Sequence, residues 1–111
     1  MENLDKKYYK IKEVEEITGL PASTLRFWET QFTMIKPRRN QGGTRFYTPA
    51  DIEKIKMVRY LVKDKGLKIE AAQEQLKNNH TGILRHSLAV DRLKGIKKEL
   101  QGLLDALHRL R

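Results

Sequence analysis

The sequence contains no cysteine, only three prolines and only 7% aromatic residues. The absence of cysteine excludes disulfides, thiolate metal sites and thiol nucleophiles. No apolar run approaches the roughly 20 residues that a membrane-spanning helix needs. The first ten residues, MENLDKKYYK, also lack the apolar core of a signal peptide. We therefore expect a cytoplasmic protein without a membrane partner.

Acidic residues are missing from one long stretch of the chain. None occurs between Glu29 and Asp51. The basic residues of this stretch are Lys36, Arg38, Arg39 and Arg45. The whole chain of 111 residues has 23 Lys and Arg against 14 Asp and Glu, a formal charge of +9. This balance predicts a polyanionic partner, with nucleic acid as the first candidate, and the length allows one small core.

No set of residues in the sequence predicts catalysis. The Gly42–Gly43 pair lacks the lysine and serine of a phosphate-binding loop. The three histidines are scattered along the chain without clustered carboxylates, so they do not predict a metal site. We expect neither an enzyme nor a bound cofactor or metal.

Two short helices are predicted after residues 1–7, which we expect to be flexible. Apolar residues recur at steps of three over residues 11–20, which indicates one buried helix face. Gly19 is suited to end this helix, and Pro21 to begin the next, which should run to about Gln31. The buried positions of the second helix would be Leu25, Trp28 and Phe32. We therefore predict a helix-turn-helix, with Trp28 in the core rather than stacked on a base.

A basic hairpin should follow the second helix. Pro37 and the Gly42–Gly43 pair interrupt any helix, and the apolar pairs Met34–Ile35 and Phe46–Tyr47 can flank a two-stranded ribbon. Such a ribbon is marginal alone, so its apolar side must pack on the helices.

The remaining chain is predicted to be helical. Residues 48–51, TPAD, are typical of a helix start, with a hydroxyl cap and proline in the first turn. The core helix that follows should end near Lys65–Gly66. A shorter helix is expected over residues 68–76, and a turn over residues 78–82.

An apolar seam marks the last segment, residues 83–111. Its positions alternate steps of three and four, as in the a and d positions of a coiled coil. They are Leu93, Ile96, Leu100, Leu103, Leu107 and Leu110. A helix this short is marginal alone in water, so we expect it to pair with a second copy as an antiparallel coiled coil. The alternative is that the helix folds back on its own domain.

The chain resembles the MerR family of winged-helix transcription regulators in two segments, STLRFWE (residues 23–29) and KPRRNQGGTRFYTPADIEKI (residues 36–55). They match the arginine, two aromatics and glutamate of the family's second helix and the proline, arginine, glycine and tyrosine pattern of its wing. The resemblance covers residues 8–78. It implies a mainly α fold: a winged helix-turn-helix DNA-binding domain with a small β-hairpin wing, followed by a C-terminal dimerisation helix.

The resemblance also implies which residues contact DNA. Arg26 and Phe27 occupy recognition-helix positions that face the duplex, where Phe27 either touches sugar or a thymine methyl or makes no contact. Ser23 and Thr24 open that helix and either bind phosphate or only cap the helix. The positions at which the wing would contact the DNA backbone are Lys36, Arg38, Arg39, Asn40, Gly43, Arg45 and Tyr47.

Three features depart from the family pattern. Phe27–Trp28 stands where a tyrosine pair is common, and Thr44 replaces a tyrosine of the wing. Metal-sensing members place cysteines after the coiled coil, and drug-sensing members place a separate domain there. Neither follows residue 110, so we expect no recognisable effector-sensing domain.

The resemblance implies a bacterial homodimer that binds a pseudo-palindromic promoter site and distorts it. Its partners would be double-stranded DNA, a second copy of the chain and RNA polymerase at the promoter, and it would be nucleoid-associated when bound to DNA. The alternative is an excisionase-like or architectural DNA-bending accessory protein, which would need no symmetric site. The seam favours the first reading, because closed dimers suit palindromes.

Overall fold

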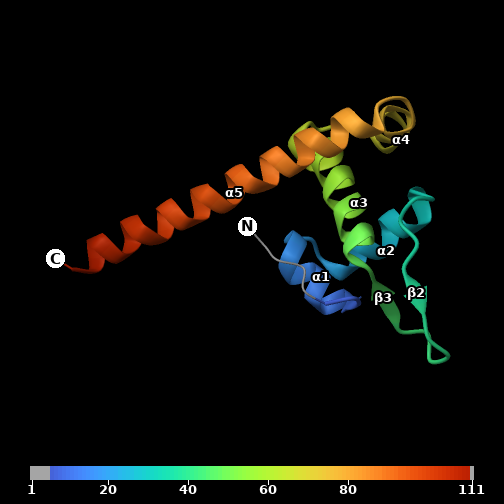
Figure 1. The fold of residues 1–111 in the computed structure, drawn as a ribbon, viewed down its shortest axis with the longest axis horizontal. Coiled ribbons are helices and arrows are strands. Elements are labelled where there is room, and N and C mark those ends of the chain that lie inside the picture. The colour runs from blue at the N-terminus through green and yellow to red at the C-terminus, as the bar shows by residue number, and fades with distance from the viewer. Residues whose placement is uncertain (1–5, 111) are drawn as a thin grey trace.

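The computed structural model describes residues 6–110, shown with their helices and strands in Figure 1. In chain order these are β1 (Tyr9–Lys10), α1 (Ile11–Thr18), α2 (Ala22–Gln31), β2 (Arg38–Arg39), β3 (Arg45–Tyr47), α3 (Pro49–Arg59), the π-helix η1 (Tyr60–Asp64), α4 (Ile69–Asn78) and α5 (His80–Arg109). The fold is therefore mainly helical with one small sheet, as predicted. Residues 1–5 of the segment expected to be flexible lie outside the described residues.

The turn between α1 and α2 is fixed by backbone conformation and by one carboxylate. Gly19 ends α1 with a φ of 73°, which L side chains rarely adopt, and its N–H donates to the carbonyl of Glu15 at 2.8 Å. The side chain of Glu15 then accepts a hydrogen bond from the N–H of Ala22 at 2.8 Å. Pro21 lies at the N-cap of α2 rather than inside its first turn. The two helices thus form the predicted helix-turn-helix.

The sheet has three strands in the order β1-β3-β2, so the prediction of a two-stranded ribbon was incomplete. All neighbours are antiparallel, with Tyr9 opposite Tyr47 and Arg39 opposite Arg45. The Met34–Ile35 pair does not flank the ribbon as expected. The N–H of Ile35 instead closes a turn onto the carbonyl of Phe32, and its side chain is buried in the core. The ladder begins only after Pro37, which has no N–H to donate.

Helix α3 forms the centre of the core. Thr48 and Asp51 cap it reciprocally, because each backbone N–H donates to the other residue's side chain at 3.2 and 3.0 Å. The helix continues into η1, where the N–H of Lys65 donates to the carbonyl of Tyr60 at 2.9 Å. The chain turns at Gly66, close to the predicted end. The largest fully buried side chains are Tyr47, Leu25, Ile35, Ile52, Ile55, Met57, Leu61, Val14 and Val58.

The turn expected over residues 78–82 is much shorter in the structure. Only Asn79 separates α4 from α5, which begins at His80 and includes Gly82. The Asn79 side chain folds over this junction, with atoms 2.6 Å from the place where a Cβ on Gly82 would lie. Glycine at this position therefore leaves room for the Asn79 amide in this orientation, and its low helix propensity is the reason that the sequence predicted a turn here.

Helix α5 packs on its own domain only over its first half. Ile83 and Ser87 are buried against the domain, Asp91 and Lys94 form ion pairs with α3 and η1, and beyond these residues the helix extends away from the domain (Figure 1). The seam does not fold back on the domain, because its positions are exposed. Their exposed fractions are Leu93 64%, Ile96 48%, Leu100 58%, Leu103 64%, Leu107 56% and Leu110 82%. Within residues 6–110, no helix combines the length and the apolar character needed to cross a lipid bilayer.

Candidate nucleic-acid interface

Helix α2 presents different side chains to the core and to solvent. Leu25 and Trp28 are buried, and Trp28 packs edge-to-face on Phe32 with ring centroids 6.4 Å apart. The prediction that Trp28 is a core residue is therefore confirmed. Arg26 and Phe27 lie on the outer face, where Phe27 is 52% exposed. An exposed aromatic beside an arginine is suited to the apolar and charged parts of a DNA groove.

The first turn of α2 contains both predicted hydroxyl residues. Ser23 is exposed and Thr24 is half-buried. Neither caps the helix, because Pro21 occupies the N-cap and its carbonyl accepts from the N–H of Thr24 at 3.0 Å. The two hydroxyls are thus placed at a helix N-terminus, where backbone geometry favours bound anions.

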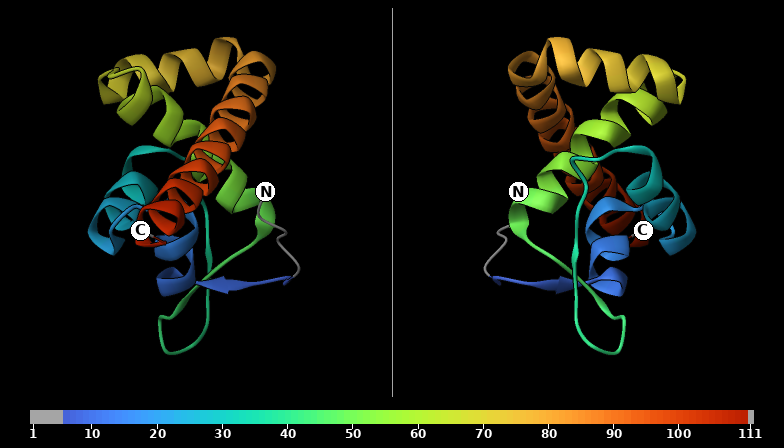
Figure 2. Two further views of the ribbon diagram at one scale, coloured as in Figure 1. Left: turned by 90° about the vertical axis from the view of Figure 1, so that its left-hand side faces the viewer. Right: turned by 90° about the vertical axis from the view of Figure 1, so that its right-hand side faces the viewer.

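The tip of the β2–β3 hairpin is a turn built on Asn40. Its side chain accepts from the N–H of Thr44 at 3.0 Å, and its carbonyl accepts from the N–H of Gly43 at 3.0 Å. Gly43 has a φ of 82°, which explains glycine at this position. In Figure 2 the hairpin projects beyond the helices at the lower edge of the molecule. The structure therefore places Asn40 and Gly43 as residues that shape the hairpin.

The predicted wing cations are divided between the two faces of the hairpin. Successive residues of a strand point to opposite faces, so Arg38 and Arg39 are not equivalent. Arg39 and Arg45, which are opposite each other in the register, both reach the side chain of Glu29 on α2. Lys36 and Arg38 are exposed. The hairpin and α2 are thus joined through charged side chains.

Glu29 lies between the two arginines. Its Oε1 is 2.8 Å from Nη2 of Arg39, and its Oε2 is 2.6 Å from Nε of Arg45. Burial acts to raise the pKa of this carboxyl, but the hydrogen bonds and charges of Arg45 and Arg39 outweigh it and lower the pKa. Glu29 was missed as a site residue by the sequence analysis. The available signal was its position as the last acid before the acid-free stretch.

Tyr47 is placed differently from the sequence expectation. It was assigned to the surface that contacts the DNA backbone, but the structure buries it completely. Tyr47 alternates with Phe46 along β3 and faces the helices, and its hydroxyl has no hydrogen-bond partner among the described residues. Burial, with the nearby charge of Glu29, raises the pKa of Tyr47 to about 12. Tyr47 therefore packs the hairpin on the core and does not lie on the surface.

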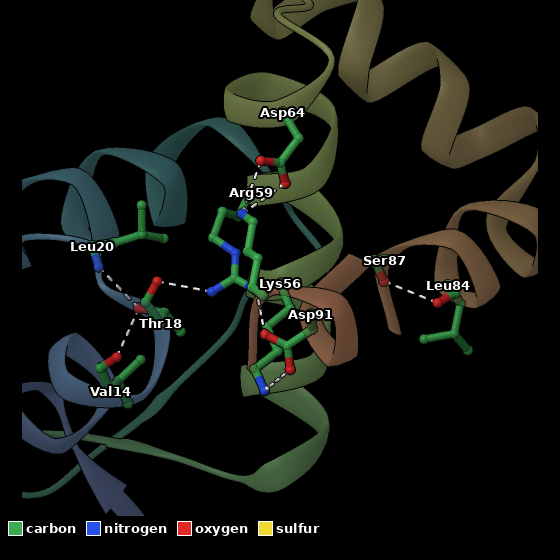
Figure 3. A network of polar contacts seen from close by, with 10 residues as sticks. Val14, Thr18, Leu20, Lys56, Arg59, Asp64, Leu84, Ser87 and Asp91 are labelled. Atoms are coloured by element: carbon green, nitrogen blue, oxygen red, sulfur yellow. Dashed lines mark hydrogen bonds and ion pairs between the residues drawn. The ribbon is translucent and has the colours of Figure 1, made fainter. Parts of the chain in front are cut away.

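A second polar network connects the helix-turn-helix to α5 (Figure 3). Nη1 of Arg59 donates to the carbonyl of Thr18 at 2.8 Å, and its Nη2 donates to Asp91 at 2.7 Å. Lys56 donates to the other oxygen of Asp91 at 2.8 Å. Burial acts to raise the pKa of Asp91, and the hydrogen bonds from Lys56 and Arg59 lower it by more. Sequence reasoning missed this network, because the partners are more than 30 residues apart.

The described residues contain no group of three or more His, Cys, Asp or Glu side chains that could bind a metal ion. A groove of about 490 Å³ lies between the end of α1, α3 and α5, and Arg59 and Asp91 form part of its wall. Part of its charged lining belongs to the network described above, and the lining does not resemble a catalytic site. The exposed basic surface of α2 and the hairpin remains the candidate site.

Comparison with known proteins agrees with this geometry. Residues 9–79 match the family model described as MerR HTH family regulatory protein. The chain is 28% identical over 110 residues to the HTH-type transcriptional regulator ZntR of Escherichia coli K12, covering 92% of this chain and 77% of that protein. It is 29% identical over 75 residues to the regulator MlrA of the same organism, covering 68% of this chain but only 30% of MlrA.

A solved structure also shares the fold. The crystal structure of a MerR family transcriptional regulator from Listeria monocytogenes aligns with a TM-score of 0.52 and 28% identity, covering 92% of this chain and 80% of the other. The family model spans more than half of the chain, and the recognition helix and wing lie inside the matched range. This chain therefore belongs to the MerR family of helix-turn-helix regulatory proteins, which are DNA-binding transcription regulators and not enzymes.

Proposed function

We propose that this protein binds double-stranded DNA sequence-specifically as a homodimer, at a pseudo-palindromic promoter site that it distorts. The observation that carries the proposal is the exposed leucine seam on α5, which extends from a domain with a basic surface formed by α2 and the hairpin. The seam supplies the two-fold symmetry, and the basic surface supplies the DNA contacts.

The seam is suited to a second copy of the same helix. Helix α5 extends beyond the domain and carries six apolar side chains at a and d spacing. Each of them is about half exposed or more. Large exposed apolar patches on a helix favour association. Since a coiled coil of identical helices is self-complementary, a homodimer covers this surface without another protein. An antiparallel arrangement would place the two DNA-binding domains at opposite ends.

The DNA surface combines two kinds of contact. Arg26 and Phe27 lie exposed on α2, where they can reach base edges in a major groove. The exposed cations of the hairpin, Lys36 and Arg38, can neutralise phosphates beside it. In a dimer, each domain would contact one half of a symmetric site. Distortion of the promoter between the half-sites would then change its presentation to RNA polymerase in the bacterial cytoplasm.

Selection of bound duplexes from a random DNA pool, at near-physiological salt, tests the proposal. We expect a motif with two-fold symmetry, because two identical domains would bind it. A composition bias without a symmetric motif, together with steep salt dependence, would instead indicate an architectural DNA-bending protein. Light scattering on the free protein and on the complex should give two chains in each case.

A further inference from the structure

The Glu29 carboxylate connects the recognition helix to both strands of the hairpin. It receives Nη2 of Arg39 from β2 and Nε of Arg45 from β3, at 2.8 and 2.6 Å. The side chains of Glu29 and Arg45 are only 16% and 21% exposed, whereas Arg39 is 51% exposed. The pair with Arg45 is therefore the more enclosed half of this cluster, where solvent screens the interaction less.

The position of Glu29 offsets an electrostatic repulsion within the hairpin. Arg39 and Arg45 are directly opposite each other in the β2–β3 register. Like charges at such positions repel and destabilise the strand pair. A carboxylate between them offsets this repulsion and gives the three side chains a net charge of one. The position of the hairpin relative to α2 thus depends on this acidic residue as well as on the buried face of β3.

The contact uses only part of the Arg45 guanidinium. An arginine has five N–H donors in a planar fork, and a phosphate is bound best by two of them in parallel. Glu29 accepts from Nε of Arg45, on the side of the group. Among the described residues the two terminal nitrogens have no hydrogen-bond partner, so they can bind a phosphate while the contact with Glu29 restrains the plane of the group.

We propose that Glu29 is a positioning residue for DNA recognition: it orients Arg45 toward a backbone phosphate and fixes the hairpin relative to the recognition helix. The inference rests on the proposed function and deepens it. Glu29 makes no DNA contact in this arrangement, because its oxygens are occupied by arginines and its charge repels phosphate. Its contribution to affinity is made through Arg45.

This role has an effect opposite in sign to that of charge alone. Removing an acid from a DNA-binding surface strengthens binding to every duplex, because electrostatic attraction to phosphates increases. Removing a positioning residue weakens binding to the selected duplex, because there the guanidinium of Arg45 must be aligned with a phosphate. Glu29→Gln keeps the shape of the side chain and removes its charge, so it separates the two effects.

The first test measures the affinity of Glu29→Gln for the selected duplex and for a scrambled duplex of equal length and composition. We expect about tenfold weaker binding to the selected duplex, the size of one charge-assisted hydrogen bond, and unchanged or stronger binding to the scrambled one. Glu53→Gln, at an exposed position of α3, makes the same charge change away from the hairpin and should affect both duplexes equally. If Glu29→Gln alters both duplexes by the same factor, or neither, the positioning role is overturned.

A double-mutant cycle tests whether Glu29 acts through Arg45. Lysine keeps the charge of Arg45 but has no planar fork to orient. In an Arg45→Lys background, Glu29→Gln should therefore weaken binding to the selected duplex by much less than tenfold, which is non-additive behaviour. The same tenfold loss in both backgrounds would show that Glu29 acts by another route and overturn the proposal.

A final measurement needs neither DNA nor a variant. In NMR spectra of the free protein, the Nε–H of Arg45 should exchange with water much more slowly than that of Arg38, which is exposed on the same hairpin. Equal exchange rates would overturn the role of Glu29, whatever DNA is selected. If no motif is selected from the DNA pool but the Nε–H of Arg45 exchanges slowly, the proposal of sequence-specific binding is overturned. The contact between Glu29 and the hairpin would still stand.

Discussion

Nη2 of Arg59 on α3 lies 2.7 Å from Oδ1 of Asp91 on α5. The same guanidinium donates through Nη1 to the carbonyl of Thr18, the last residue of α1. Because the Arg59 side chain is only 9% exposed, one buried cation joins the helix-turn-helix to the helix that carries the seam. The orientation of α5 relative to α2 therefore depends on a polar contact as well as on apolar packing.

Asp91→Asn should destabilise the protein. The substitution leaves the buried ammonium of Lys56 and the buried guanidinium of Arg59 without the charge of Asp91. Removing one partner from a buried ion pair is costly, and since Asp91 is 28% exposed we expect a loss of about 2–3 kcal/mol in the free energy of unfolding. Urea denaturation measures it. Asp105→Asn, at an exposed position of α5, is the matched control, and equal losses in the two variants would contradict the assignment.

Stability should fall in acid because of Glu29 and Asp91. Both carboxyls have a pKa below the ordinary values of 4.5 and 3.8 in the folded protein. The unfolded chain therefore takes up these protons at a higher pH than the folded chain does. The stabilisation is fully present above the ordinary values and is lost as the pH falls through the lowered ones. Urea denaturation between about pH 6 and pH 3 should show this decline, and Glu29→Gln should make it shallower. A decline unchanged in that variant would contradict the assignment to Glu29.

Tyr47→Phe should not destabilise the protein. The hydroxyl it removes is buried and has no partner within residues 6–110, so its loss relieves a desolvation cost, and we expect a change between zero and a gain of about 1 kcal/mol. Tyr9→Phe is the matched control, because the Tyr9 hydroxyl accepts from the N–H of Lys6 at 3.0 Å. Thermal unfolding compares the two. A marked loss of stability on Tyr47→Phe would mean that the hydroxyl has a partner.

Leu103→Lys should convert the proposed dimer to monomers. The substitution places a charge at the centre of the apolar seam, where Leu103 is 64% exposed in the single chain. Light scattering across a dilution series measures the mass. Gln101→Lys adds the same charge to an exposed position off the seam and should leave the mass at two chains. A dimer that persists at low concentration in Leu103→Lys would place the interface elsewhere.

Arg45→Ala should weaken binding to all duplexes, because its charge attracts any phosphate, and should weaken binding to the selected duplex further, because the oriented guanidinium fork is also lost there. The salt dependence should lose about one unit of slope, equivalent to one phosphate. Titrations at several salt concentrations measure both quantities. Arg92→Ala, at an exposed position of α5, removes the same charge outside the proposed surface. A change in site preference at constant affinity would mean that Arg45 contacts a base.

The helices could be predicted from the sequence because their signals are local. The reciprocal cap of Thr48 and Asp51, the end of α1 at Gly19 and the apolar period of α5 each depend on neighbouring residues. The junction at Asn79 could not be predicted, since a single residue separates two helices and Gly82 is helical there. The sheet was only partly predicted, because pairing of β1 with β3 joins segments distant in the sequence.

The site was predicted in composition more than in arrangement. The basic hairpin and the exposed face of α2 follow from residue type and spacing. The proposed role of Glu29 depends on its contacts with Arg39 and Arg45, which lie 10 and 16 residues away in the sequence. The burial of Tyr47 depends on which face of β3 packs on the helices. Neither the contacts of Glu29 nor the burial of Tyr47 follows from a local sequence pattern, because both depend on tertiary packing.

Helix α5 is anchored to its own domain as far as Lys94, which pairs with Asp64 of η1 at 2.8 Å, and its exposed seam starts at Leu93. The anchored segment thus meets the start of the seam, and both belong to one unbroken helix. The angular offset between the DNA-binding domain and the seam is therefore fixed by helix geometry, at about 100° for each residue. Inserting a single residue at position 92 would rotate the two domains of a dimer about the pairing axis and place their recognition helices on different faces of the duplex. In the proposed dimer, a residue count within α5 would thus set how the two domains meet the half-sites.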